Sequence, residues 1–291
     1  MKKLEGTGVA LVTPFKKDFT VDFDGLTKLV NHVIDGGLDY LVVLGTTGES
    51  ATLEASERDA VLSHVKKINA NRLPIVLGIG GNNTAALLKE FERVDLSGVT
   101  AILSASPYYN KPTQEGIYQH YKLLAEKAPL PIILYNVPGR TASNISATTT
   151  LRLANDCKNI IGIKEASADM QQVMQIIKNR PEGFLMISGE DALTFPIITC
   201  GGEGVISVVA NSQPKLFSEM VNASRKGDLE LAKKRHYQLI DFINLLFQEG
   251  NPGGVKAALK IQAVCGDSMR LPLVCVSENL ENQLGLALKS L

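Results

Sequence analysis

The chain has 291 residues, of which 45% are hydrophobic and 21% are charged, as in an ordinary soluble protein that can bury a sizeable core. Its 30 basic and 30 acidic side chains balance, so it lacks the one-sided charge that nucleic acid or an anionic membrane surface would attract. A small-molecule ligand fits this composition better.

The amino-terminal segment contains only a short apolar run before Pro14, too short for a signal peptide or a membrane span. We therefore expect the protein in the cytosol. The cysteines form no CxxC pair, and the histidines fall in expected helices without an HxxxH pair, so we expect reduced thiols and no metal site. These residues are Cys157, Cys200, Cys265, Cys275, His32, His64, His120 and His236.

Short apolar, β-branched runs alternate with longer segments of helical periodicity along most of the chain. This alternation is typical of βαβ units and a parallel sheet. The expected strands are residues 8–12, 40–44, 75–78, 100–103, 132–135, 160–163, 184–187 and 204–209.

Helix signals separate these runs. Asp22 precedes the apolar stripe of a first helix, which Gly36 closes, and Ser56 opens a second helix. Eight strands separated by helices favour a closed (β/α)8 barrel over an open doubly wound sheet.

The last part of the chain is expected to be a helical extension. It contains a helical run at 229–248, a turn at 249–254 and a second helix through Val264. We predict one structural unit, with the (β/α)8 catalytic barrel at 1–226 and the extension at 227–291 packed on it.

In such barrels the chemistry collects at the carboxyl ends of the strands. The segments that follow the expected strands carry hydroxyls, phenols, one arginine and one lysine, which would converge on one rim. These segments are residues 45–49, 106–110, 135–140, 164–165 and 188–191.

Lys164 directly follows an apolar strand, which would leave its amine at the edge of the barrel interior. A desolvated lysine is a candidate nucleophile; the alternative is a lysine that marks a strand end in solvent. A working amine needs desolvation or a neighbouring proton acceptor, and Tyr135 and Tyr109 could relay protons.

The other rim residues also have plain structural interpretations. Tyr135 could be an interfacial aromatic residue with a wet hydroxyl. Thr46 and Thr47 could form an ordinary turn, although two hydroxyls beside backbone amides also suit a carboxylate. Arg140 could be a surface charge or a fork for a second carboxylate.

Two glycine-rich segments are candidate phosphate sites. Residues 78–82 lack the GxGxxG spacing, which argues against a dinucleotide. Residues 201–204, near the expected eighth strand, could form a phosphate cup as in other barrels.

At its rim the chain resembles the dihydrodipicolinate synthase family, within the pyruvate-dependent class I aldolase superfamily that also holds N-acetylneuraminate lyase. The resemblance spans nearly the whole chain. Its most specific pieces are residues 45–49, 107–112, 135–141 and 162–166.

The resemblance implies that Lys164 forms an imine with pyruvate and that Thr47, with neighbouring amides, holds the pyruvate carboxylate. Tyr135 would be the central proton donor and acceptor. Thr46 and Tyr109 would complete a proton relay, with Tyr109 entering from the neighbouring subunit of a tight dimer.

Further family features complete this expectation. Arg140 would bind the carboxylate of L-aspartate 4-semialdehyde, and Gly189 and Ile206 would line the pyruvate pocket through backbone atoms. The implied reaction joins the two substrates in the diaminopimelate route of lysine biosynthesis without a metal or organic cofactor. Tight dimers would pair into a homotetramer.

Two alternatives remain. One is an aldolase that cleaves a sialic acid or a 2-keto-3-deoxy sugar acid, although such relatives generally lack the Tyr-Asn-Val-Pro-Gly-Arg segment that contains Arg140. The other is a pyruvate-binding or scaffolding barrel that has lost catalysis, against which the intact set of rim residues argues.

The response to L-lysine is a separate expectation. Feedback-sensitive relatives bind lysine with two histidines and a glutamate in the segments that correspond to Ala55, Arg58 and Ala86. Those partners are missing here, so we expect weak or absent inhibition, because a buried ammonium without its acidic partner is poorly compensated.

Overall fold

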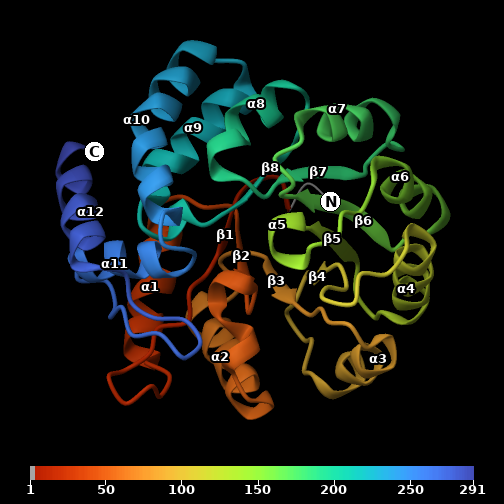
Figure 1. The fold of residues 1–291 in the computed structure, drawn as a ribbon, viewed down its shortest axis with the longest axis horizontal. Coiled ribbons are helices and arrows are strands. Elements are labelled where there is room, and N and C mark those ends of the chain that lie inside the picture. The colour runs from red at the N-terminus through yellow and green to blue at the C-terminus, as the bar shows by residue number, and fades with distance from the viewer. Residues whose placement is uncertain (1–3) are drawn as a thin grey trace.

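A computed structural model describes residues 4–291 and confirms the (β/α)8 barrel with a carboxyl-terminal helical extension (Figure 1). The strands are parallel and follow one another around the barrel in chain order, and the first pairs with the last. They are β1 (Gly6–Ala10), β2 (Tyr40–Val43), β3 (Ile75–Gly78), β4 (Ala101–Ala105), β5 (Ile132–Asn136), β6 (Ile160–Glu165), β7 (Leu185–Ser188) and β8 (Gly204–Ser207).

Helices surround the strands and continue beyond the eighth. They are α1 (Phe23–Asp35), α2 (Ala55–Asn69), α3 (Thr84–Arg93), α4 (Gln114–Lys127), α5 (Pro138–Thr141), α6 (Ala147–Asp156), α7 (Met170–Asn179), α8 (Thr194–Thr199), α9 (Pro214–Lys226), α10 (Leu229–Phe247), α11 (Gly253–Ile261) and α12 (Glu278–Ser290). Short 3-10 helices lie at η2 (Thr46–Gly48), η3 (Ser50–Thr52), η4 (Asp191–Leu193) and η5 (Val209–Asn211).

Capping side chains explain where the first helices begin. The Asp22 carboxylate accepts from the backbone N–H of Gly25, which confirms the predicted start of α1. Helix α2 begins one residue before the predicted Ser56, because Glu54 and Glu57 form a capping box around its first turn.

Strand ends differ from the expected ones where backbone pairing continues past the apolar run or stops short of it. Strand β6 includes Lys164, which pairs with Tyr135 of β5 and Ile187 of β7, so the lysine lies within the sheet rather than after it. Strand β1 runs from Gly6 to Ala10 rather than 8–12. Strand β8 stops at Ser207 because the chain turns into η5.

The barrel interior is packed at its amino-terminal level by Tyr40. Its ring lies against Gly8, where an added Cβ would come within 2.2 Å of it, and its hydroxyl donates to the carbonyl of Val205 at 3.0 Å. A cluster of buried apolar side chains that includes Ile133 and Ile187 fills the interior above it. Space for a ligand is therefore confined to the carboxyl end.

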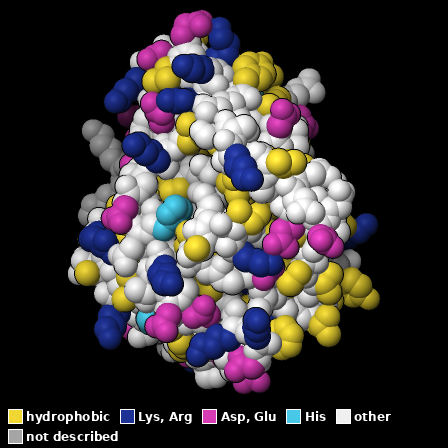
Figure 2. Space-filling view, turned by 90° about the vertical axis from the view of Figure 1, so that its left-hand side faces the viewer, with side chains coloured by type: hydrophobic (Ala, Val, Ile, Leu, Met, Phe, Trp, Pro, Cys, Tyr) yellow, Lys and Arg dark blue, Asp and Glu magenta, His cyan; other side chains and the backbone are white. Residues whose placement is uncertain are grey.

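The carboxyl-terminal extension lies on one side of the barrel (left in Figure 1), where α10 packs along α9 and α12 packs against α10 and α11. Helices α10 and α11 end one and three residues earlier than predicted. On this face acidic and basic side chains are interspersed (Figure 2). The predicted division at 226/227 falls in the short link between α9 and α10 and stays a prediction.

Across the described residues, no helix combines the length and apolar character needed to cross a bilayer.

Candidate active site

Lys164 and Tyr135 face each other on neighbouring strands at the carboxyl end of the barrel. They are directly paired between β5 and β6, and the lysine Nζ lies 4.3 Å from the centre of the tyrosine ring. Only 4% of Lys164 and 7% of Tyr135 is exposed. A buried amine at the carboxyl end of a barrel is well placed for nucleophilic chemistry.

Gly189 lets the chain after β7 approach this lysine. An added Cβ at Gly189 would come within 2.6 Å of the Ala166 side chain and 3.1 Å of Lys164 Cε, and its N–H donates to the carbonyl of Glu165 at 2.7 Å. Ile206 on β8 is buried in the same interior cluster as Tyr135. The structure therefore places Gly189 beside Lys164, and Ile206 in the interior cluster that contains Tyr135.

Two carboxyl groups follow Gly189. Burial raises the pKa of Glu190 and of Asp191, and the charge of Lys164 opposes both shifts. Asp191 Oδ2 accepts from the N–H groups of Val208 and Val209 at 3.0 and 2.9 Å, which ties the segments after β7 and β8 together.

Glu165 supports the lysine from the other side of the strand. Its carboxylate accepts from the amides of Asn136 at 3.0 Å and Gln172 at 2.9 Å, and from the N–H of Ser167 at 2.8 Å. Burial raises its pKa against these hydrogen bonds. This network fixes the backbone that carries Lys164.

Thr46 and Thr47 lie in η2, directly after β2, with opposite exposures. Thr47 is buried, whereas Thr46 is exposed. Glu49 follows in the left-handed conformation at φ 52°, and its N–H donates to the carbonyl of Thr46 at 3.0 Å. Of these two threonines, only Thr47 is turned inward.

Arg140 lies in the single-turn helix α5, where a turn was predicted, and it is exposed. Its Nη2 donates to the carbonyl oxygen of Asn251, at 3.4 Å. Asn251 belongs to the turn between α10 and α11. The extension therefore reaches the rim beside this guanidinium.

Within this chain, Tyr109 is not brought to Lys164 and Tyr135. It is 88% exposed and has a positive φ of 67° in the segment between β4 and α4. The side-chain amide of Asn82 holds the backbone of the adjacent Tyr108. It donates to the Tyr108 carbonyl at 2.7 Å and accepts from the Tyr108 N–H at 2.9 Å. Tyr109 is thus presented outward from an anchored loop.

Three residues near the site had no role assigned from the sequence: Asn251, Glu49 and Lys256. The amide of Asn251 donates to Thr47 Oγ1 at 3.0 Å. Lys256 of α11 forms a fully buried ion pair with Glu49 and donates to the carbonyl of Ser268 at 2.9 Å. In the sequence, the glycines and proline at 249–254 predict a turn. They do not indicate which residues the turn contacts.

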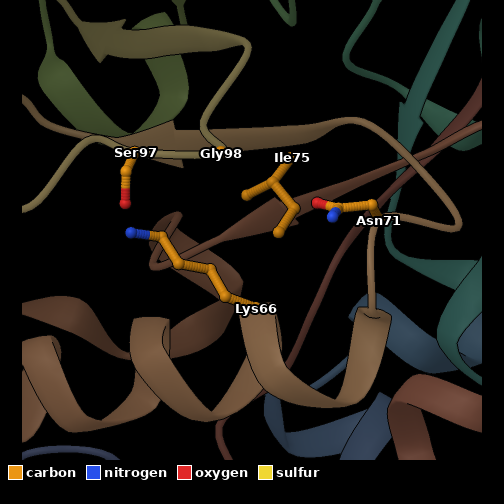
Figure 3. A pocket seen from close by; sticks show the side chains of 5 residues that line it. All are labelled: Lys66, Asn71, Ile75, Ser97 and Gly98. Atoms are coloured by element: carbon orange, nitrogen blue, oxygen red, sulfur yellow. The ribbon is translucent and has the colours of Figure 1, made fainter.

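A separate pocket lies at the amino-terminal end of β3 (Figure 3), away from the predicted site residues. It is lined by Lys66 in the last turn of α2 and by Asn71 just after that helix, together with Ile75, Ser97 and Gly98. The Lys66 amine is already held by Asp95, at 2.6 Å from its carbonyl and 3.0 Å from its carboxylate. Residues at this end of a barrel typically serve stability.

Within residues 4–291, no three His, Cys, Asp or Glu side chains cluster as metal ligands would.

A closed barrel with a buried lysine over a tyrosine ring at its carboxyl mouth is the arrangement of the Schiff-base, or class I, aldolase-type barrels. The chain belongs to the dihydrodipicolinate synthetase family, whose model matches residues 3–291.

Relatives and solved structures agree with this assignment. The chain is 54% identical over 291 residues to the 4-hydroxy-tetrahydrodipicolinate synthase of Flavobacterium psychrophilum, covering 100% of this chain and 99% of the relative. It is 41% identical to a dihydrodipicolinate synthase from Thermotoga maritima, with a TM-score of 0.95 and coverage of 98% and 97%. A monomeric dihydrodipicolinate synthase variant is 40% identical, with a TM-score of 0.96 and coverage of 99% and 97%.

Proposed function

We propose that this chain is a lyase that condenses pyruvate with L-aspartate 4-semialdehyde, the reaction of 4-hydroxy-tetrahydrodipicolinate synthase in the diaminopimelate route to lysine. Family membership over the whole chain supports the reaction. The observation that carries the proposal is the buried Lys164 amine, 4.3 Å from the Tyr135 ring centre at the barrel mouth.

In the proposed first half-reaction, the Lys164 amine attacks the carbonyl carbon of pyruvate, and water leaves as the imine forms. The imine draws electrons from the pyruvate methyl group, so loss of a methyl proton gives an enamine. Tyr135 supplies and accepts protons in these steps, and Thr46 and Tyr109 pass them onward.

In the second half-reaction, the enamine carbon attacks the aldehyde carbon of the semialdehyde, and the resulting alkoxide takes up a proton. The amino group of that substrate then attacks the imine carbon. The bond to Lys164 breaks, the ring closes and the lysine is released as an amine. One water is released overall, at the first step.

We assign the binding roles by charge and position. Thr47 and neighbouring amides hold the pyruvate carboxylate, and Gly189 and Ile206 line its pocket through backbone atoms. Arg140 binds the carboxylate of the semialdehyde, because its guanidinium offers a bidentate fork at the rim.

The assembly is also a proposal. Tyr109 is exposed and held outward, which suits a side chain that completes the site of a neighbouring subunit in a tight dimer. Two such dimers would form a homotetramer, and the small polar substrates fit a cytosolic enzyme.

Borohydride reduction with pyruvate, followed by peptide mass mapping, tests the mechanism. We expect a reduced pyruvate adduct on Lys164 and none when pyruvate is omitted. An adduct on another residue, or no adduct, would contradict the mechanism.

A paired assay tests the second substrate. The enzyme is given pyruvate with either L-aspartate 4-semialdehyde or a polyhydroxylated aldehyde, and product is followed for each. We expect turnover with the semialdehyde. Preference for the sugar aldehyde would instead assign a sugar-acid or sialic acid aldolase.

A further inference from the structure

The turn between α10 and α11 contacts the candidate pyruvate site from outside the barrel. Asn251, in this turn, is 9% exposed, and its Nδ2 donates to Thr47 Oγ1 at 3.0 Å. Its backbone carbonyl accepts from Arg140 at 3.4 Å. One residue of the extension therefore touches both side chains assigned to the substrate carboxylates.

The amide of Asn251 uses only part of its hydrogen-bonding capacity. Within residues 4–291, its Oδ1 is buried and has no hydrogen-bond partner. A half-satisfied buried amide costs stability, so an apolar side chain would serve folding alone at least as well. This contrast indicates a role in the site rather than in the core.

The direction of the hydrogen bond decides what Thr47 can offer a ligand. A threonine hydroxyl has one hydrogen to donate and two lone pairs that accept. Because the Asn251 amide donates to Thr47 Oγ1, the hydroxyl hydrogen is left to point elsewhere. A carboxylate only accepts hydrogen bonds, so it binds a hydroxyl held in this state best.

A second tie holds the same two segments together. Lys256, in α11, forms a buried ion pair with Glu49, two residues beyond Thr47. The Lys256 amine also lies 4.4 Å from the centre of the Phe15 ring. The turn is thus anchored near the threonine whether or not the Asn251 side chain is present.

We propose that Asn251 is a positioning residue for the keto acid: its amide donates to Thr47 and so directs the Thr47 hydroxyl hydrogen toward the substrate carboxylate. This inference rests on the proposed function, because it takes pyruvate as the ligand of Thr47. Asn251 acts through Thr47 and Arg140 and not on the reacting carbon.

Two variants of the full-length enzyme separate this role from simple packing. Asn251→Ala removes the donor, and we expect the pyruvate concentration for half-maximal borohydride trapping at Lys164 to rise about tenfold. Asn251→Asp keeps the shape but replaces the donor with an acceptor and adds a negative charge. We expect a further rise of about tenfold or more, since the aspartate would take the Thr47 hydrogen and repel the keto acid.

The kinetic pattern distinguishes positioning from a general loss of structure. Both variants should raise the KM for pyruvate more than they lower kcat, and Asn251→Ala should change the KM for the semialdehyde little because the backbone contact with Arg140 remains. Asn244→Asp, at an exposed position of α10, is the matched control and should behave as wild type. Thermal unfolding of each variant checks folding.

A double-mutant cycle gives an independent measure. In a Thr47→Val background the hydroxyl is gone, so Asn251→Ala should add little to the loss of pyruvate binding. Full additivity, or an Asn251→Ala enzyme that traps pyruvate like wild type, would overturn the inference. An Asn251→Asp enzyme no worse than Asn251→Ala would overturn the assigned direction of the hydrogen bond.

Failure of the proposed function itself gives a different result. In that case wild type forms no pyruvate adduct at Lys164 at all, and the inference falls with it. When wild type is trapped and the Asn251 variants match it, only the role of Asn251 is rejected.

Discussion

The strand-borne and loop-borne parts of the rim are held in different ways. Lys164 and Tyr135 are buried and positioned by the pairing of β5 with β6. Thr46, Arg140 and Tyr109 lie on exposed connections. Arg140 contacts the carboxyl-terminal extension, and in our proposal Tyr109 contacts a second subunit. The comparison teaches that strand pairing in the barrel holds the buried amine, whereas a turn outside the barrel contacts the groups at the rim around it.

Removing the strand-borne amine should have the largest effect. We expect Lys164→Ala to lower kcat by about 10⁴-fold or more, because in the proposed mechanism the imine forms on this amine. Lys178→Ala, at an exposed position of α7, should leave kcat near wild type. A Lys164→Ala enzyme that retains several per cent of the rate would show that the amine is not the nucleophile.

Breaking the Lys256–Glu49 ion pair between the extension and the barrel should have the next largest effect. Lys256→Met leaves Glu49 buried without its partner, so we expect the free energy of unfolding to fall by about 3–5 kcal/mol. Denaturation at fixed protein concentration measures this loss. Lys260→Met breaks exposed pairs on the same helix and should cost less than about 1 kcal/mol. If both variants lost the same free energy of unfolding, the buried pair would contribute no more to stability than the exposed pairs.

Tyr109 tests whether the loop-borne part comes from a second subunit. We expect Tyr109→Phe to lower kcat by about 10²-fold, through loss of proton transfer. After subunit exchange with Lys164→Ala, hybrid dimers should regain one complete site each, giving roughly a quarter of the wild-type rate. No gain on mixing would place Tyr109 in the site of its own chain or outside the reaction.

A smaller effect, of pH on the free energy of unfolding, is expected from His120 in α4. Burial lowers the pKa of His120, on α4, from 6.5 to about 4, and its Nδ1 lies 2.8 Å from Thr84 Oγ1. The unfolded chain thus takes up this proton first as the pH falls, so the contribution of neutral His120 to stability is lost between the two pKa values. We expect a loss of about 2 kcal/mol from pH 7 to pH 5.

His120→Asn removes this titration while keeping a polar partner for Thr84. The difference in free energy of unfolding between wild type and this variant should therefore change across that pH range. A difference independent of pH would contradict the assignment to His120.

L-lysine should have the smallest effect of all. Arg58 lies 3.5 Å from Glu90, so this carboxylate already faces a cation, and Ala55 and Ala86 offer no side-chain partner for an ammonium. We expect millimolar L-lysine to change the initial rate little. Strong inhibition would contradict this, and Ala86→Glu with Ala55→His and Arg58→His tests whether sensitivity can be introduced.

Sequence patterns predicted the barrel because its strands and helices depend on local periodicity, whereas the roles of the rim residues stay predictions. Even so, the patterns placed Lys164 after its strand. The apolar run ends at Ile163, but the backbone pairing of β6 continues through Lys164. The roles of Asn251 and of the Lys256–Glu49 pair could not be predicted, because each contact spans more than two hundred residues of sequence and depends on how α11 packs.

Tyr40 has a consequence for the order of events in the reaction. Because its buried ring fills the barrel interior against Gly8, we expect substrates to reach the candidate site only from the carboxyl end, so that the one that binds deeper binds first. In the proposed reaction Lys164 lies deepest, so we expect the keto acid to bind before the aldehyde. An aldehyde that occupies the mouth of the empty enzyme forms a dead-end complex, so excess second substrate should inhibit in competition with pyruvate.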